Sequence, residues 1–504
     1  MKPMAPDLII FSIWLFPLSA LAACIAIPNA HLQGMVSVAG ALLSFLASVV
    51  VLVQVASFFP ATVISHWIGL NAFGSVVLVI ETFGAFTATV FAVGSISARS
   101  STDAARRSFW IWFNLFLMSL YAIPLLQEIA LVWLALTLTT LFSVFLISFD
   151  SDTAALEAGW KYALMTTLGA AVAVLGILML YWAMAQAGST DFSWAGLAAV
   201  APKLPPTILN LAFLMILAGL GAKAALIPFH AWLPDAYSRA PFPICAMLSI
   251  LESAAIPYVL LQLAFIAGYT PHSTANEWLL AFGLVSAGGA ALLMIQTHEY
   301  KRLFAYSTIE NAGIVLAAGA AATVHARSAA VWQMVAHGIS KPLIFYACGV
   351  IFLMTNQLRL ANIQGLLSRT RSGGTVLMVA GLAVAGAPPF AIFLSELAVL
   401  KSTIESPRPW VGILLAFFMI ISFCAITYHL FRMVLGPPAE DSHGGVCRPA
   451  PRLCAAAVVI SAIPVIALGW YIPQSITRDI GAAGTTRFFG HPPSVAEMIK
   501  GARP

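Results

Sequence analysis

The sequence predicts an all-α membrane protein that crosses the bilayer about fourteen times. Of its 504 residues, 61% are hydrophobic and only 9% are charged, and the mean hydropathy is +0.94. A soluble domain of this size needs more charged residues to cover its surface. Apolar runs of twenty or more residues recur along the chain, whereas a transmembrane β-barrel shows short segments of alternating polarity.

The apolar segments divide the chain into three parts. We expect N-terminal helices in residues 1–70, a core in 71–435, and a last helix followed by an extracytoplasmic tail in 436–504. The first span is too long for a cleaved signal peptide and is read as a retained helix. The expected spans are 8–28, 33–57, 71–97, 109–127, 129–149, 161–185, 207–230, 241–267, 277–297, 303–322, 326–355, 374–400, 409–435 and 452–472.

Basic residues in the short loops predict the orientation, because cytoplasmic loops carry the excess of lysine and arginine. If the N-terminus is periplasmic, one side of the membrane collects most of these residues and becomes the cytoplasmic side. We therefore expect a multi-pass protein of a bacterial inner membrane. The basic side holds Arg99, Arg106, Arg107, Lys161, Arg239, Lys301, Arg302, Arg359, Arg369, Arg371, Arg448 and Arg452, and the other side holds only Lys203, Arg327, Lys401 and Arg408.

Two spans are interrupted by proline in the same way. Ala-Gly-Leu at 218–220 precedes Pro228-Phe229, and Ala-Gly-Leu at 380–382 precedes Pro388-Pro389-Phe390. Proline removes a helix hydrogen bond and clashes with the previous turn, so both helices should break. The second segment comes five spans after the first, an odd offset, which predicts two inverted five-helix repeats at about 109–267 and 277–435. Paired interrupted helices of this kind mark a transport site near the middle of the membrane.

Ionisable residues occur inside several predicted spans, where they are costly and usually functional. Lys223, Lys341 and Glu396 each lie near a proline break, which favours a functional role over a structural ion pair. Glu81 and Glu252 suit either interpretation equally. The full set is Glu81, Lys223, Glu252, Glu310, His337, Lys341 and Glu396.

The residue types suit proton conduction. His337 and Lys341 are four residues apart and share one face of a helix. Burial disfavours a charged ammonium group and a nearby carboxylate favours it, so a buried lysine can release and regain a proton. Arginine holds its proton permanently and would not serve. The six cysteines show no paired spacing, and we expect no metal site and no cofactor.

Several motifs resemble one known family. Lys223, with the run Pro-Phe-His-Ala-Trp-Leu-Pro-Asp-Ala at 228–236 that contains His230, is similar to the signature of antiporter-like subunits. These subunits occur in respiratory complex I, cation/proton antiporters and energy-converting hydrogenases. Ala-Leu-Glu-Ala-Gly-Trp-Lys-Tyr at 155–162 and the segment 300–311 resemble the hydrogenase-4 F-type subunits most. The resemblance covers roughly residues 70–435.

The resemblance implies a proton-translocating membrane subunit of a redox-driven complex, with membrane and soluble redox subunits as partners and no nucleic acid. This subunit would have no redox centre of its own and would not itself be catalytic. Lys223 would be the central proton carrier, Lys341 with His337 a connecting site, and Glu396 the terminal carboxylate. The proton pathway we expect comprises Lys223, His230, Glu310, His337, Lys341 and Glu396, with Glu81 and Glu252 as possible additions.

One departure from the family and three alternatives stay open. The family usually has a glutamate in the fifth span to pair with the central lysine, and Thr137 stands at that position here. The first half-channel is therefore altered or silent. A sodium/proton antiporter module is an alternative, because broken helices can offer carbonyl ligands to sodium. A second alternative is a membrane partner that uses the proton gradient for a soluble inorganic-carbon-uptake protein. A third is a structural scaffold that pumps no protons, which the missing carboxylate at Thr137 allows.

Overall fold

The computed structural model describes residues 6–58, 61–63, 67–97, 102–437 and 449–471. The tail expected beyond the last helix lies outside these residues. The N-terminal helices are α1 (Pro6–Ala26), α2 (Ala30–Phe58), α3 (Ala72–Ser97), α4 (Asp103–Leu125), α5 (Ile129–Ile147) and α6 (Thr153–Gln186). A two-stranded antiparallel hairpin of β1 (Ala61–Val63) and β2 (Gly69–Asn71), which was not predicted, joins α2 to α3.

The middle of the chain contains the first interrupted span. Its elements are α7 (Trp194–Val200), η1 (Ala201–Lys203), α8 (Pro206–Lys223), α9 (Trp232–Arg239), α10 (Phe242–Ile250), the π-helical turn η2 (Leu251–Ala255) and α11 (Ile256–Ala267). The predicted span 207–230 thus stops at Lys223, and a separate short helix comes after the break.

The last third contains the second interrupted span. Its elements are α12 (Ala275–Ile295), α13 (Tyr300–Ala320), α14 (Val324–Thr355), η3 (Leu360–Ile363), α15 (Leu366–Arg369), α16 (Arg371–Val384), α17 (Ala391–Ile404), α18 (Pro409–Leu435) and α19 (Arg452–Trp470). Among the described residues, thirteen helical segments are long and apolar enough to cross a membrane, and the shorter α16 and α17 make up the second broken span. The prediction of an all-α polytopic fold with about fourteen spans is confirmed.

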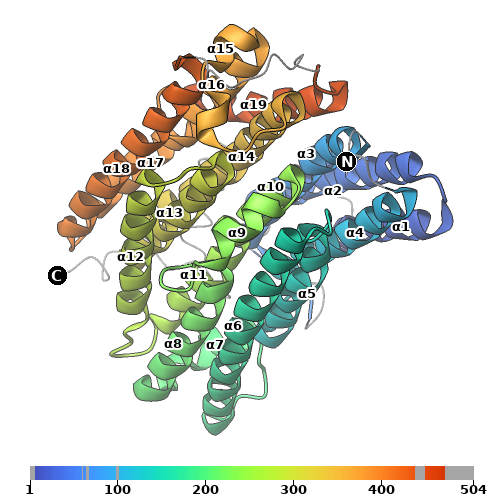
Figure 1. Cartoon of the computed structure of the whole chain (residues 1–504). Helices are drawn as coiled ribbons and strands as arrows, with labels where there is room; N and C mark the ends of the chain where they lie inside the picture. Colours follow the sequence, from blue (N-terminus) through green and yellow to red (C-terminus); the bar gives the residue numbers. More distant parts are fainter. Residues whose placement is uncertain (1–5, 59–60, 64–66, 98–101, 438–448, 472–504) are drawn as a thin grey trace.

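The helices form an elongated bundle in which α3, α10, α11, α13 and α14 are central (Figure 1). Every residue from Phe242 to Ala267 is buried, and α3, α13 and α14 are buried over most of their length. Helix α3 packs against α2, α10, α14 and α19, so it joins the N-terminal helices to the rest of the bundle. Helices that are apolar all round belong in such a core.

Glycines permit close contact between α6 and α8. A Cβ atom at Gly169 would lie 2.6 Å from the carbonyl oxygen of Gly219. A Cβ atom at Gly219 would lie 2.6 Å from the backbone nitrogen of Ala173. Small residues at helix interfaces let backbones approach, which is how packing and dispersion hold helices together in lipid. This contact fixes α8, and therefore its terminal Lys223, against α6.

We predict that Gly219→Leu lowers stability by about 2 kcal/mol or more, because the new side chain collides with the backbone of α6. Leu211→Phe enlarges a lipid-facing side chain of the same helix and is the matched control. Thermal unfolding of the two purified variants in one detergent measures the difference. Equal melting temperatures for Gly219→Leu and the control would show that this contact is not tight.

Candidate functional site

The first break holds Lys223 at the very end of α8. Residues 224–231 form turns rather than helix, and Ala225 has a positive φ of 53°. The exposed backbone groups find partners within the protein: Trp232 Nε1 donates to the Ala222 carbonyl at 2.9 Å, and the Ile227 N–H donates to Ser286 Oγ at 3.0 Å. Broken backbone at membrane depth needs such partners. These hydrogen bonds hold the backbone of the first break in one conformation.

Lys223 is buried, with 2% of its surface exposed, and its ammonium donates to the Thr140 hydroxyl of α5. Thr137, at the position of the family glutamate, bonds instead to the Trp133 carbonyl of its own helix at 2.8 Å. The contact from α5 thus comes from the residue three positions later, nearly one helical turn. Helix α5 offers Lys223 a hydroxyl group and no carboxylate.

Glu252 supplies the carboxylate that α5 lacks. It lies on the π-helical turn η2, is 1% exposed, and interacts electrostatically with both Lys223 and Lys341. Its Oε2 accepts a hydrogen bond from the Tyr237 hydroxyl at 2.7 Å, and its Oε1 has no hydrogen-bond partner among the described residues. Glu252 therefore lies within the electrostatic reach of both lysines.

Lys341 is fully buried on α14, and its ammonium donates to the Phe304 carbonyl of α13 at 2.7 Å. The expectation of a helix break here is wrong: α14 runs without interruption through Pro342. The residues around Pro342 are packed on all sides, and neighbouring helices can hold a proline-containing helix together. His337, one turn earlier, shares a 2.9 Å hydrogen bond between its Nδ1 and Ser253 Oγ.

Glu310 and Glu396 continue the series beyond Lys341. Glu310 of α13 is 3% exposed and interacts with Lys341 and with the Ser422 side chain of α18. Glu396 of α17 is partly buried and interacts electrostatically with Glu310. We call these five residues, Lys223, Glu252, Lys341, Glu310 and Glu396, the central row.

The second break receives the Glu396 carboxylate. Gly386 in this break has a φ of +79°, which only glycine adopts at no cost. A Cβ atom at Gly386 would collide with the Glu396 carboxylate. The positive φ and the nearby carboxylate both explain why this position is a glycine. Lys223 lies at the first break and Glu396 at the second, so each interrupted helix holds one end of the central row.

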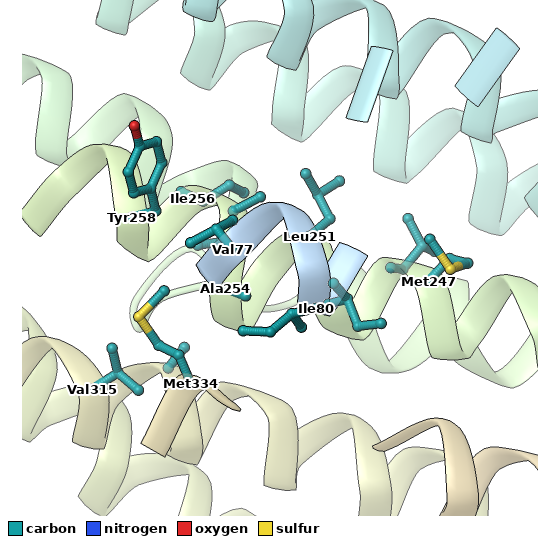
Figure 2. Close-up of a cluster of buried hydrophobic side chains, with 14 of the residues drawn as sticks. Val77, Ile80, Met247, Leu251, Ala254, Ile256, Tyr258, Val315 and Met334 are labelled. Atoms are coloured by element: carbon teal, nitrogen blue, oxygen red, sulfur yellow. The ribbon is translucent and has the colours of Figure 1, made fainter. Parts of the chain in front are cut away.

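An apolar cluster fixes the turn that carries Glu252 (Figure 2). Leu251 and Ala254 of η2 pack with Ile80 of α3 and Met334 of α14, and all four are buried. A π-helical turn inserts one residue and rotates the rest of the helix about its axis, and such turns are frequent at functional sites. In this turn Glu252 meets Tyr237 while its neighbour Ser253 meets His337.

Two predicted residues lie apart from the central row. His230, in the first break, is half-buried, and its ring centroid lies 6.5 Å from that of Tyr306. Glu81 of α3 is fully buried, and its electrostatic neighbours are Tyr121 and Tyr258 rather than the row. Neither carboxyl oxygen of Glu81 has a hydrogen-bond partner among the described residues.

Three residues that hydrogen-bond to the predicted site residues were not predicted from the sequence: Thr140, Tyr237 and Ser253. No spacing rule connects Tyr237 to Glu252, because a break and a π-helical turn lie around them. Thr140 could have been found by asking which α5 hydroxyl faces α8 once the two helices are packed. Ser253 stands next to a buried glutamate, which is a weak signal.

Comparison with known proteins identifies the family. The family model described as NADH:quinone oxidoreductase/Mrp antiporter, transmembrane, matches residues 126–423. The chain belongs to this family. The matched segment contains the whole central row, and Glu81 lies outside it.

Individual members of the antiporter family extend the similarity. The chain is 34% identical over 320 residues to a hydrogenase-4 component F homolog of Methylacidiphilum infernorum, covering 63% of this chain and 67% of that one. It is 27% identical over 442 residues to NADH-quinone oxidoreductase subunit N of Moorella thermoacetica, covering 85% and 90%. A chain of the archaeal membrane-bound sulfane sulfur reductase complex has the same fold, with a TM-score of 0.82, 22% identity and coverage of 95% and 97%.

We predict that Thr140→Val destabilises the protein by about 1–3 kcal/mol, because a buried ammonium loses its acceptor. Thr137→Val removes only a bond within its own helix and is the matched control, with an expected cost below about 1 kcal/mol. Thermal unfolding of the purified variants compares them. An equal loss in both would mean that the hydroxyl of Thr140 does not support Lys223.

Proposed function

We propose that this antiporter-family chain is a proton-translocating membrane subunit of a redox-driven, respiratory-type complex, and that the central row carries the protons. Its relatives include a hydrogenase-4 component F homolog and subunit N of NADH-quinone oxidoreductase. The observation that carries the proposal is the unbroken series of electrostatic neighbours from one interrupted helix to the other.

Alternation of lysine and glutamate over the first four members makes the row suitable for moving a proton. Glu252 lies between Lys223 and Lys341, and Glu310 lies between Lys341 and Glu396. A proton that leaves one lysine weakens that lysine's attraction for the neighbouring carboxylate, which then favours its own protonated form. The state of one site thereby biases the next, so a proton shift can propagate along the row.

Water would complete the pathway between these side chains. Glu252 Oε1, Glu310 Oε1 and His337 Nε2 are buried and have no hydrogen-bond partner among the described residues. Buried polar atoms need partners, and water inside a polar interior supplies them. Glu252 and Glu310 are the row members on either side of Lys341, and His337 stands beside Lys341, so water bound to these atoms would link the row.

The predicted residues outside the central row have smaller roles in this proposal or none. His337 is bonded to Ser253 and stands beside Lys341, so it would connect the Glu252 side of the row with the Lys341 side. His230 would help protons reach the row through the first break and would not be a member of the row. Glu81 is left out of the pathway because its neighbours are tyrosines of α4 and α11.

The organisation around the row follows from the proposal. The conducting core would be residues 71–435, with inverted repeats at about 109–267 and 277–435 that each contribute one broken helix. We further propose a bacterial inner membrane location with a periplasmic N-terminus, supported by the basic loops on one side. Electron transfer would take place in partner subunits, and the row would respond to it.

We predict that Lys341→Ala lowers redox-linked proton translocation about tenfold or more, because the row loses its central positive charge. Lys401→Ala, which removes an exposed lysine near the end of α17, is the matched control and should leave translocation unchanged. Inverted membrane vesicles containing the assembled complex, with a pH-sensitive dye as readout, measure the rates.

The same vesicles test the alternatives. Proton movement that needs sodium would indicate a sodium/proton antiporter module. Proton movement that depletes an imposed gradient without any electron donor would indicate a partner that uses the gradient. Unchanged redox-linked translocation in Lys341→Ala would contradict the proposed role of the row.

A further inference from the structure

A second polar feature lies at one end of the bundle, away from the central row. A cavity of about 940 Å³ opens where α12 turns into α13, beside the last turns of α18 and the segment after α14. Its polar lining includes Gln296, His298, Arg302, Arg359, His429 and Arg432. We call it the α12–α18 cavity. The central row contributes none of its walls.

The charge of the α12–α18 cavity is strongly positive. Three arginines and two histidines line it, against a single carboxylate, Glu299. Arg302 is already paired, with Asp235 at 2.6 Å and Glu299 at 3.5 Å. Arg359 and Arg432 have no carboxylate within 4.0 Å among the described residues, and Arg432 rests on the Tyr428 ring at 5.6 Å. Two uncompensated guanidinium groups in one concave site attract an anion.

His429 forms part of the cavity wall but is not a donor to an occupant. It lines the cavity from α18 with only 7% of its surface exposed. Its ring interacts with the backbone of Ile295 and Met294, and its buried Nε2 is not accessible from the cavity. The groups that can bind an anion are therefore the guanidinium groups of Arg359 and Arg432.

The surroundings of the cavity indicate that its occupant is amphiphilic. The cavity lies where apolar helices end, on the side that the basic loops mark as cytoplasmic. Ile295 and Tyr428 form part of its wall and are 54% and 57% exposed, on faces that a membrane would cover. Basic pockets between membrane helices at this level bind the headgroups of anionic lipids.

We propose that the α12–α18 cavity binds the phosphate group of an anionic lipid, with Arg359 and Arg432 as donors and the acyl chains along Ile295 and Tyr428. Free inorganic phosphate is also an anion and could use the same donors, but it gains nothing from the apolar wall. The lipid source is favoured because the cavity is open towards the exposed apolar side chains. This proposal does not depend on the proposed proton pathway.

Native mass spectrometry of the full-length, delipidated protein tests the proposal. The probes are dioleoyl phosphatidylglycerol and dioleoyl phosphatidylcholine, which have the same acyl chains, together with inorganic phosphate. The wild type should bind the first phosphatidylglycerol about tenfold more tightly than phosphatidylcholine, and Arg359→Gln with Arg432→Gln should abolish this preference. Arg369→Gln with Arg371→Gln removes two basic residues of the same side outside the cavity, and it should keep the preference.

A conservative variant separates loss of the charged group from a general folding defect. Arg432→Lys keeps the charge and should retain most of the preference for phosphatidylglycerol. If the Arg359→Gln, Arg432→Gln protein binds phosphatidylglycerol as the wild type does, the cavity is not the site. If the wild type shows no preference for phosphatidylglycerol, and inorganic phosphate protects the wild type but not this variant from thermal unfolding, the cavity is a site for free phosphate and the lipid assignment is wrong.

Discussion

Mutual compensation between buried lysines and glutamates is the interaction on which the rest of this structure depends. A single charged side chain at the centre of a membrane costs about 3 kcal/mol or more on insertion scales. Five ionisable groups in one bundle would be untenable if each stood alone. They stand instead in sequence, with Glu252 between Lys223 and Lys341 and with Glu310 beyond Lys341. The lysines and glutamates lower the cost of burying one another, whereas Glu396, at the far end, is partly exposed and neighbours the like-charged Glu310. The series crosses the bundle from one broken helix to the other.

The unusual backbone features serve to hold these groups in place. Helix α8 stops at Lys223, and the close contact with α6 through Gly169 and Gly219 sets the position of that stop. The π-helical turn η2 aims Glu252 at Tyr237 and its neighbour Ser253 at His337. The second break contains a glycine where the Glu396 carboxylate needs room. Strained or irregular backbone of this kind persists only when its surroundings over-determine it, and here the apolar cluster around η2 does so.

The sequence was sufficient for the spans, the two interruptions and most of the buried ionisable residues, because each depends on local composition or on proline. It was insufficient for the arrangement of those residues. Whether Glu252 faces a lysine depends on the rotation of its helix, and the π-helical turn changes that rotation without leaving a sequence signature. Thr140 rather than Thr137 meets Lys223 because of how α5 packs on α8. The predicted helix break at Pro342 does not occur, because packing on all sides of α14 outweighs the local preference of proline.

Serial transfer through the central row is the central claim, and a double-variant measurement tests it most directly. Redox-linked proton translocation is compared in vesicles that carry Glu252→Gln, Glu310→Gln or both. If both carboxyl groups belong to one series, removing the second after the first has little further effect, so the double variant equals the slower single variant. If the two losses multiply, each residue acts independently, and the account of one continuous row is contradicted.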